Sequence, residues 1–305
     1  MVQRLGIIGA GDIARKTFLP ILADREDCKL VGIYSRTKLA ASEVAKQYGI
    51  EHVYDGLDEL LGRNDIDTVF VCTPTESHLT IVQAALKQSK NVLVEKPLTG
   101  KIEDDVSLLK LARLQSKTFY VAFNNYFREE NQWLSRQVLA GTFGGVQMIN
   151  LEWYRAQPFP TDGVLMHLGA KLFHFALSLL PERRSFTAIC QNLNRFDEAA
   201  ADEDTSIASV VIDGNVSLNM RLAWNIALPA GSLTNLDIFG EKGVVSNRDF
   251  KGTQSDGYES MIDEFLGRSG SGEPMDLNLV EDTLNLVNAL YQSHRARSTV
   301  SGNFA

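Results

Sequence analysis

A glycine-rich turn directly after the first apolar segment most restricts the folds that this 305-residue chain can adopt. Residues 4–9 (RLGIIG) have the composition of a buried strand, and Gly9, Gly11 and Ala14 follow in the spacing G-x-G-x-x-A. Gly9 permits a tight turn, Gly11 lets the backbone approach a ligand, and Ala14 lets the next helix pack on the strand. Free N–H groups at the helix start favour phosphate. The spacing predicts a dinucleotide phosphate site, the alternative being an ordinary glycine turn. The predicted contacts are Gly9, Gly11, Asp12, Ile13 and Ala14.

Strand and helix patterns alternate through the first part of the chain. After the first strand and the helix at 12–23, strands are predicted at 29–34, 68–72, 91–94 and 118–123, and helices at 37–48, 76–88 and 101–115. Such alternation produces a parallel, doubly wound sheet with crossover helices on its faces. We therefore predict a dinucleotide-binding domain over residues 1–123.

The end of the second predicted strand bears on the choice of cofactor. NAD sites usually place Asp or Glu there to bind the ribose 2′-hydroxyl. This chain instead has Ser35, Arg36 and Thr37. A guanidinium and two hydroxyls suit the additional phosphate of NADP, because arginine donates paired hydrogen bonds to phosphate oxygens. We predict NADP; in the alternative, Arg36 stacks on adenine and the site accepts NAD as well.

Polar residues follow two further strands where these leave the predicted sheet. Thr73 and Pro74 follow the strand at 68–72, with His78 near the start of the next helix, while Glu95 and Lys96 follow the strand at 91–94. Ligands of open α/β sheets bind at this carboxyl edge. We expect Thr73 and Pro74 beside the nicotinamide ribose and Lys96 beside both nicotinamide and substrate. Glu95 and His78 join the predicted cofactor site, although a lone histidine is more often a packing residue.

The second half of the chain has a different organisation. Strands are predicted at 146–155, 186–190, 205–213, 216–224 and 233–239, and helices at 125–139, from Thr161 or Asp162 to about 180, at 259–266 and at 277–294. Tight turns such as Asp213-Gly214-Asn215 join antiparallel strands. We predict a second, α+β domain over residues 124–305, with an open and mainly antiparallel sheet.

The helix that ends near residue 180 carries three basic-capable side chains. His167, Lys171 and His174 are spaced i, i+4 and i+7, so they share one helix face beside an apolar stripe. The alternative is a solvated face, with Lys171 extending to water. The lysine between the histidines would repel a cation, so we predict no metal site.

Composition excludes several classes of partner. The 30 basic and 38 acidic residues give a formal charge of −8, which argues against nucleic acid. Cys28, Cys72 and Cys190 are too few for a disulfide framework, and buried thiols in a reducing, cytoplasmic compartment are expected. The start of the chain has no leader pattern, and no apolar run approaches the ~20 residues of a membrane span.

Five segments together resemble the Gfo/Idh/MocA oxidoreductases, and within them the MviM-like dehydrogenases. The segments are GIIGAGDIA at 6–14, CTPTESH at 72–78, VEKP at 94–97, AGTFGGV at 140–146 and LMHLGAKLFH at 165–174. The resemblance implies NAD(P)-dependent oxidation or reduction at a hydroxyl or carbonyl of a sugar, polyol or related compound. It also implies that Lys96 hydrogen-bonds the reacting oxygen, and that the second domain binds substrate and forms a homodimer or homotetramer through its open sheet.

The chain departs from the family pattern at four positions, and at one of them His174 stands where a further Asp is common. His167 stands where the family usually has Asp, Lys171 where it has the acid/base His, and Tyr126 where it often has Arg. We therefore retain His167, Lys171 and Tyr126 with Lys96 as candidate catalytic residues. Lys96, Lys171 and His167 would make an acidic substrate plausible. The altered helix also supports a different class: a sensor or regulatory protein that binds NADP(H) or sugar without catalysis.

Overall fold

The computed structural model describes residues 2–157, 163–194, 203–224, 226–271 and 276–305. Its contacts divide the chain into two compact units, Met1–Ala122 with Tyr258–Leu277, and Phe123–Gly257 with Asn278–Ala305. The chain thus leaves the first unit next to the predicted boundary at 123, but residues 258–277, expected in the second domain, belong to the first unit. The physical reason lies in helix α8 (Tyr258–Ser271), whose Phe265 packs against Phe70 and Tyr120 at ring-centroid distances of 5.5 and 5.7 Å.

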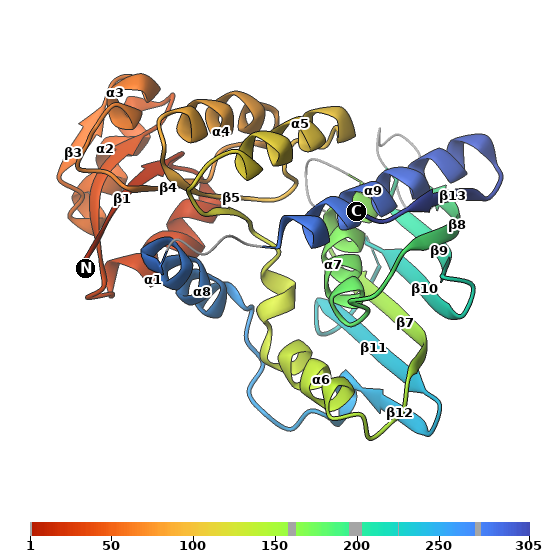
Figure 1. Ribbon diagram of the computed structural model, residues 1–305. Helices are drawn as coiled ribbons and strands as arrows, with labels where there is room; N and C mark the ends of the chain where they lie inside the picture. Colours follow the sequence, from red (N-terminus) through yellow and green to blue (C-terminus); the bar gives the residue numbers. More distant parts are fainter. Residues whose placement is uncertain (1, 158–162, 195–202, 225, 272–275) are drawn as a thin grey trace. The chain divides into compact units, whose positions relative to one another are not determined.

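A six-stranded sheet in the order β3-β2-β1-β4-β5-β6 forms the centre of the first unit (Figure 1). The strands are β1 (Gln3–Ile8), β2 (Cys28–Tyr34), β3 (His52–Tyr54), β4 (Thr68–Val71), β5 (Asn91–Val94) and β6 (Phe119–Val121). Every neighbouring pair is parallel, which confirms the predicted doubly wound sheet. The strand order reverses between β1 and β4, and ligands of such sheets bind at the carboxyl ends where this reversal occurs.

Helices cover both faces of this sheet. They are the π-helical turn η1 (Ala14–Phe18) with α1 (Leu19–Ala23), α2 (Lys38–Tyr48), α3 (Leu57–Leu61), the 3₁₀ turn η2 (Thr75–Ser77), α4 (His78–Lys87) and α5 (Ile102–Arg113). Figure 1 shows α4 and α5 on one side of the sheet and α1 with α8 on the other. All residues of β4 and β5 are buried, as expected for strands covered on both faces. The sequence analysis missed β3 and α3, whose three and five residues are too short for a clear periodicity.

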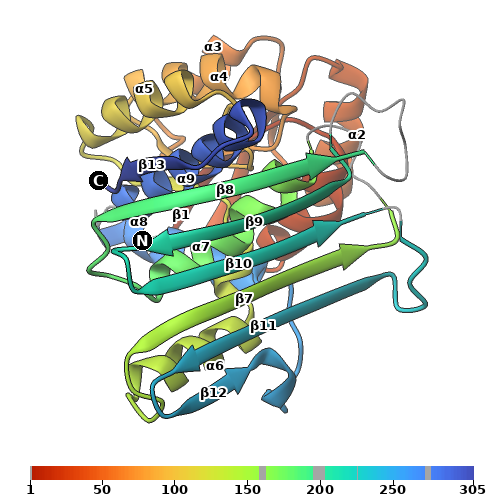
Figure 2. The ribbon, with the colours of Figure 1, turned by 90° about the vertical axis from the view of Figure 1, so that its right-hand side faces the viewer.

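The second unit contains a seven-stranded sheet in the order β12-β11-β7-β10-β9-β8-β13 (Figure 2). Its strands are β7 (Val146–Arg155), β8 (Ser185–Leu193), β9 (Thr205–Ile212), β10 (Val216–Ala223), β11 (Ser232–Gly240), β12 (Gly243–Ser246) and β13 (Val300–Asn303). The pairings are antiparallel except for β7 with β10. The predicted open, mainly antiparallel sheet is confirmed, and the parallel pair arises because β7 and β10 are joined through an intervening helix and two strands.

Among the residues that the structure describes, helices cover only one face of this second sheet. They are the 3₁₀ turn η3 (Asn124–Phe127), α6 (Glu129–Leu139), the π-helical turn η4 (Leu165–Gly169) with α7 (Ala170–Ser178), the 3₁₀ turn η5 (Asn247–Asp249) and α9 (Leu277–Ala296). In Figure 2, α6, α7 and α9 lie behind the strands and the opposite face of the sheet is uncovered. The predicted start of the α7 helix at Thr161 or Asp162, after the loop with Pro158 and Pro160, lies outside the described residues.

The three cysteines are buried as free thiols, as predicted. Burial raises the pKa of the Cys28 and Cys190 thiols to about 11, so neither forms a thiolate readily near neutral pH. Among the residues described, no helix is both long and apolar enough to cross a membrane. The same residues contain no group of three or more His, Cys, Asp or Glu side chains placed to hold a metal ion.

Candidate active site

The predicted phosphate turn connects β1 to the first helix of the first unit. Gly9 adopts a φ of +106°, and a Cβ added there would lie 2.7 Å from the carbonyl oxygen of Cys72. A side chain is therefore excluded by both backbone conformation and space. At Gly11, by contrast, an added Cβ meets nothing within 4 Å. The backbone of Gly11 is thus open on the side from which a ligand would approach.

The helix after this turn leaves donors available. The first hydrogen bond of the helix runs from Arg15 N to Gly11 O at 3.0 Å. The N–H groups of Asp12, Ile13 and Ala14 consequently have no acceptor within the helix. Asp12 and Gly11 are exposed, and the Asp12 carboxylate lies 2.7 Å from Lys16 Nζ. An open glycine backbone and a row of N–H donors fit the pyrophosphate of a dinucleotide.

The residues after β2 are available for a phosphate. Arg36 and Thr37 are exposed and Ser35 is half-buried. Within the described part of the chain, no ion pair holds the Arg36 guanidinium. Thr37 is the N-cap residue of α2, and its side chain makes no capping hydrogen bond. These three residues therefore offer a cation and two hydroxyls where the 2′ position of an adenine ribose is expected.

Lys96 follows β5 at the same carboxyl edge. Its side chain is 8% exposed, and its backbone N–H donates to Glu95 Oε2 at 3.1 Å. The other carboxylate oxygen, Glu95 Oε1, accepts the hydroxyl hydrogen of Tyr258 at 3.0 Å. The Tyr258 ring in turn packs edge-on against Phe18, with centroids 5.5 Å apart. Both carboxylate oxygens of Glu95 are thereby held, and the backbone immediately before Lys96 is ordered.

Thr73 and Pro74 follow β4 beside the glycine turn. An added Cβ at Gly9 would lie 3.1 Å from Thr73 Cγ2, which places the two loops side by side. Thr73 Oγ1 accepts a hydrogen bond from Ser77 Oγ at 2.8 Å, and Pro74 is exposed. The structure therefore brings the predicted phosphate turn and the predicted ribose contact together at the reversal of strand order.

His78, the first residue of α4, is 1% exposed. Its Nδ1 lies 3.0 Å from the carbonyl oxygens of both Pro97 and Leu98, and its Nε2 lies 2.8 Å from the carbonyl oxygen of Thr73. Both ring nitrogens are thus used by backbone carbonyls of the chain. Any contribution of His78 to cofactor binding would pass through the two loops that it contacts.

In the second unit, His167 and Lys171 belong to one helix interrupted by a π-helical turn. His167 lies within η4, and Lys171 is the second residue of α7. Widened turns of this type occur frequently at functional sites. Lys171 is 9% exposed, and its Nζ lies 5.9 Å from the centroid of the Trp153 ring. A solvated face, the alternative considered for this helix, is wrong at Lys171 because the side chain is buried and its ammonium lies over the Trp153 ring.

Aromatic residues at two neighbouring strand ends adjoin these side chains. Trp153 lies near the end of β7, and Trp224 directly follows β10. Because β7 and β10 are parallel and Ala223 pairs with Tyr154, both strands end at the same sheet edge. The rings of His167 and Trp224 have centroids 6.3 Å apart. This sheet edge therefore presents two indole rings next to His167 and Lys171.

The carboxylate of Glu203 lies at the start of the same helix. Glu203 Oε1 accepts hydrogen bonds from Leu165 N at 3.0 Å and from the Tyr291 hydroxyl at 2.9 Å. The backbone carbonyl of Glu203 also accepts Val164 N at 3.0 Å. A negative group at a helix N-terminus is favourable because the unpaired N–H groups there carry partial positive charge. Glu203 thus fixes the turn that carries His167.

His174 and Tyr126 lie together at η3. The His174 ring stacks on Phe123 with centroids 4.2 Å apart, and the Tyr126 ring meets it edge-on at 6.2 Å. The Thr283 hydroxyl donates to Leu279 O at 2.7 Å and therefore accepts from His174 Nδ1 at 3.2 Å. Burial, together with the positive charge of Arg183, lowers the pKa of His174 to about 3. His174 is therefore a neutral packing residue near neutral pH.

Comparison with known proteins gives matches to a family model and to individual relatives. Residues 3–123 match the oxidoreductase family with an NAD-binding Rossmann fold. The chain is 29% identical over 225 residues to dTDP-3,4-didehydro-2,6-dideoxy-alpha-D-glucose 3-reductase from Streptomyces antibioticus. The matched segment covers 70% of this chain and 65% of that reductase. It is 26% identical over 254 residues to inositol 2-dehydrogenase from Rhizobium meliloti strain 1021, spanning 81% and 76% of the two chains.

Residues 3–123 therefore match the Gfo/Idh/MocA oxidoreductase family, as the sequence motifs predict. Solved structures agree on the fold: myo-inositol dehydrogenase from Lactobacillus casei, in complex with NAD(H) and myo-inositol, superposes with a TM-score of 0.86 at 18% identity, covering 100% of this chain and 98% of the other. GenD2 from gentamicin A biosynthesis, in complex with NAD, superposes with a TM-score of 0.88 at 17% identity, covering 99% and 96%.

Sequence reasoning did not identify several residues that contact the predicted site. Tyr258, Glu203 and Trp153 contact the predicted site residues, but each comes from a distant part of the chain and follows no local motif. Two buried amides beside Tyr126 were also missed. Asn124 Oδ1 and Asn125 Nδ2 have no hydrogen-bond partner within the described residues. The adjacent asparagines after a buried strand were the available signal.

Proposed function

We propose that this protein is an NADP-preferring dehydrogenase or reductase of a sugar, polyol or related compound. The observation that carries the proposal is the convergence, within one unit, of the open glycine turn and Lys96 at the carboxyl edge of a single sheet. The names of its relatives, a dTDP-sugar reductase and an inositol dehydrogenase, support the substrate class. When bound, the nicotinamide would exchange a hydride with a substrate carbon.

Lys96 would hydrogen-bond the reacting oxygen of the substrate. An ammonium beside a developing alkoxide stabilises the negative charge, and a lysine can also pass a proton to it. Glu95, held by Tyr258, supports this placement because it orders the backbone immediately before Lys96. Lys96 is therefore the first candidate for the catalytic group.

His167, Lys171 and Tyr126 are the candidates for the remaining proton transfer. A histidine has an ordinary pKa near ~6.5 and can carry a proton at neutral pH, whereas a lysine does so only if its pKa falls strongly. We favour His167 on this ground, with Lys171 and Tyr126 contributing to substrate binding. The two basic side chains and the indole rings at their sheet edge also suit an acidic sugar.

A substrate panel tests the proposal directly. Inositols, aldoses, sugar acids and dTDP-sugars would be assayed in both directions with NADPH or NADH and their oxidised forms, by absorbance at the nicotinamide wavelength. Turnover of at least one class supports the oxidoreductase. Tight NADPH binding without turnover of any class supports the second candidate, an NADP(H)- or sugar-binding sensor, which the replaced Asp and His positions favour.

Replacing Arg36 with alanine is expected to weaken NADPH binding selectively. A hydrogen bond to a charged group contributes about 1.5–3 kcal/mol, so the Kd for NADPH should rise roughly 10-fold to 100-fold. The Kd for NADH should change by less than about threefold, because NADH lacks the 2′-phosphate. Quenching of tryptophan fluorescence during titration measures both values. Equal weakening of the two cofactors would instead mean that Arg36 stacks on adenine.

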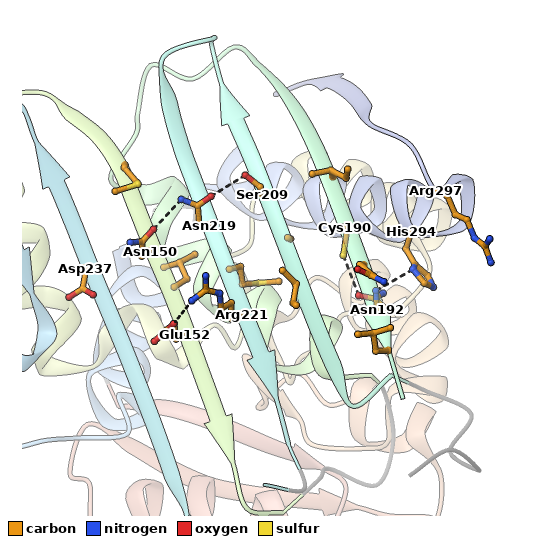
Figure 3. A pocket seen from close by; sticks show the side chains of 18 residues that line it. Asn150, Glu152, Cys190, Asn192, Ser209, Asn219, Arg221, Asp237, His294 and Arg297 are labelled. Carbon is orange, nitrogen blue, oxygen red and sulfur yellow. Dashed lines mark hydrogen bonds and ion pairs between the residues drawn. The ribbon is translucent and has the colours of Figure 1, made fainter. Parts of the chain in front are cut away.

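The open face of the second sheet supports a homodimer or homotetramer. Apolar side chains on this face include Ile189, Ile207 and Val211, which are 49%, 42% and 39% exposed. Between them Ser209, Asn219 and Asn150 are linked by hydrogen bonds of 3.0 and 3.1 Å across three strands (Figure 3). The face borders a hollow of about 1110 Å³. Exposed apolar patches of this kind commonly mark association surfaces.

Ile207→Glu is expected to convert the assembly to a 33.8 kDa monomer, because a symmetric interface would place a charge twice in an apolar contact. Sedimentation velocity at about 10 μM, a concentration at which specific interfaces are populated, measures the change. Leu114→Glu is the matched control, since Leu114 is an 81% exposed leucine on the first unit. A wild-type protein that sediments as a monomer would refute the proposed interface.

A further inference from the structure

We propose that His78 is a positioning residue that holds Lys96 in register with the loop after β4. This inference rests on the proposed role of Lys96 at the reacting oxygen. The ring of His78 joins two neighbouring loops of the first unit at the sheet edge. One loop is Lys96–Leu98, and the other begins at Thr73.

The contacts of the ring are all with acceptors. Nδ1 faces two carbonyl oxygens, those of Pro97 and Leu98, at 3.0 Å each, while Nε2 faces the carbonyl oxygen of Thr73 at 2.8 Å. A carbonyl oxygen accepts only, so each contact requires a hydrogen on the ring nitrogen. A neutral ring supplies one such hydrogen and a charged ring two. The ring lies within hydrogen-bond distance of both loops at once.

His78 occupies the gap between two other anchors of the lysine loop. Before the loop, Glu95 is held by Tyr258 at 3.0 Å. After it, Asp105 Oδ1 accepts from Thr99 N at 2.8 Å and from Thr99 Oγ1 at 2.6 Å. The His78 ring contacts the carbonyls of Pro97 and Leu98, which directly follow Lys96. Loss of the ring would leave the backbone beside Lys96 without this support.

The burial of His78 makes these hydrogen bonds costly to lose. His78 is 1% exposed and Pro97 and Leu98 are buried, so water cannot replace the hydrogen bonding that these two carbonyls would lose. A displacement of about 1 Å at a catalytic group can lower the rate roughly 100-fold. The buried His78 ring would thus set the position of the reacting groups without itself touching cofactor or substrate.

Two substitutions separate the two sides of the ring. In His78→Asn the amide nitrogen takes the place of Nδ1 and keeps the bond to the lysine loop. In His78→Gln the amide nitrogen takes the place of Nε2 and keeps the bond to Thr73. We expect His78→Gln to lower kcat about 100-fold. We expect His78→Asn to keep kcat within about threefold and to raise the KM for NADPH about three- to tenfold, the effect of one hydrogen bond. Thr80→Ala, exposed on the same helix, is the control.

A second readout needs no substrate. Hydrogen–deuterium exchange of the purified full chain with NADPH should show faster exchange of amides 98–101 in His78→Gln than in wild type, and unchanged exchange there in His78→Asn. Equal effects of the two variants on both kcat and exchange would overturn the proposal. Thermal melts of both variants report whether they fold; unfolding of His78→Asn, which keeps the lysine-side bond, would also count against it.

The double variant distinguishes failure of this inference from failure of the proposed function. If His78 acts through Lys96, adding His78→Gln to Lys96→Ala should lower kcat by less than about twofold further, because coupled residues are non-additive. A full additional 100-fold loss would overturn the positioning role. Unchanged activity in Lys96→Ala alone would instead overturn the proposed function.

Discussion

Lys96→Ala is expected to lower kcat/KM about 1,000-fold while the Kd for NADPH changes less than about fivefold. One positioned donor to a developing oxyanion contributes roughly 100- to 1,000-fold, and a positioned proton carrier contributes a similar factor. The cofactor should still bind, because the phosphate turn and Arg36 are separate from Lys96 along the chain. Steady-state kinetics on the best substrate of the panel, with NADPH titration, measure both quantities.

Lys96→Arg divides the two contributions of the lysine. Arginine keeps the positive charge but does not release its proton near neutral pH. Activity retained in this variant would assign Lys96 to charge stabilisation, and activity lost as in Lys96→Ala would assign it to proton transfer. Lys101→Ala is the matched control, since Lys101 is an exposed lysine on the same segment. Wild-type kinetics in Lys96→Ala would exclude Lys96 from the chemistry.

The first half of the site was predictable because its constraints are local. Three features can each be recognised from a pattern of about ten residues, the range over which strand and turn patterns act. They are the turn at Gly9 and Gly11, the end of β2 and the strand before Lys96. Parallel strands then place all their carboxyl ends at one edge without further information. Fold class and loop positions followed from these patterns alone.

The contacts that fix the site residues were not predictable in this way. Tyr258 reaches Glu95 across 163 residues, and Glu203 reaches Leu165 across 38. An amphipathic helix indicates that one face is buried, but it does not say against which sheet, so α8 was assigned to the wrong unit. The role of His78 likewise depends on carbonyls about 20 residues away, which no spacing rule on the helix itself reveals.

His174 shows how burial decides the chemistry of a residue whose spacing alone is ambiguous. The sequence placed His174 on one helix face with His167 and Lys171 and did not decide whether its ring exchanges protons. The structure surrounds it with Phe123 and Thr283 at 2% exposure. Its protonation must therefore oppose folding, and this has a measurable consequence at acidic pH.

As the pH falls below 6.5, the free energy of unfolding is expected to decrease more steeply in the wild-type protein than in His174→Phe. Burial lowers the pKa of His174 to about 3, whereas the unfolded chain takes up the same proton near pH ~6.5. The unfolded state thus binds one more proton between these pH values, so the free energy of unfolding falls by about 1.4 kcal/mol per pH unit there. At pH 4.5 the loss from this residue is about 2–3 kcal/mol.

Urea unfolding followed by tryptophan fluorescence from pH 7.5 to 4.5 measures this dependence. His174→Phe keeps a ring stacked on Phe123 and removes the titrating group, so its free energy of unfolding should fall less steeply with acid by one proton. His52→Gln, which removes an exposed histidine, should retain the wild-type slope. Parallel slopes in wild type and His174→Phe would contradict the assignment of a buried neutral ring. A ring that stays neutral throughout this pH range cannot carry a proton in catalysis. If the wild-type slope is confirmed, His174 is excluded as a proton carrier, and His167 remains as the histidine of that helix face that can carry one.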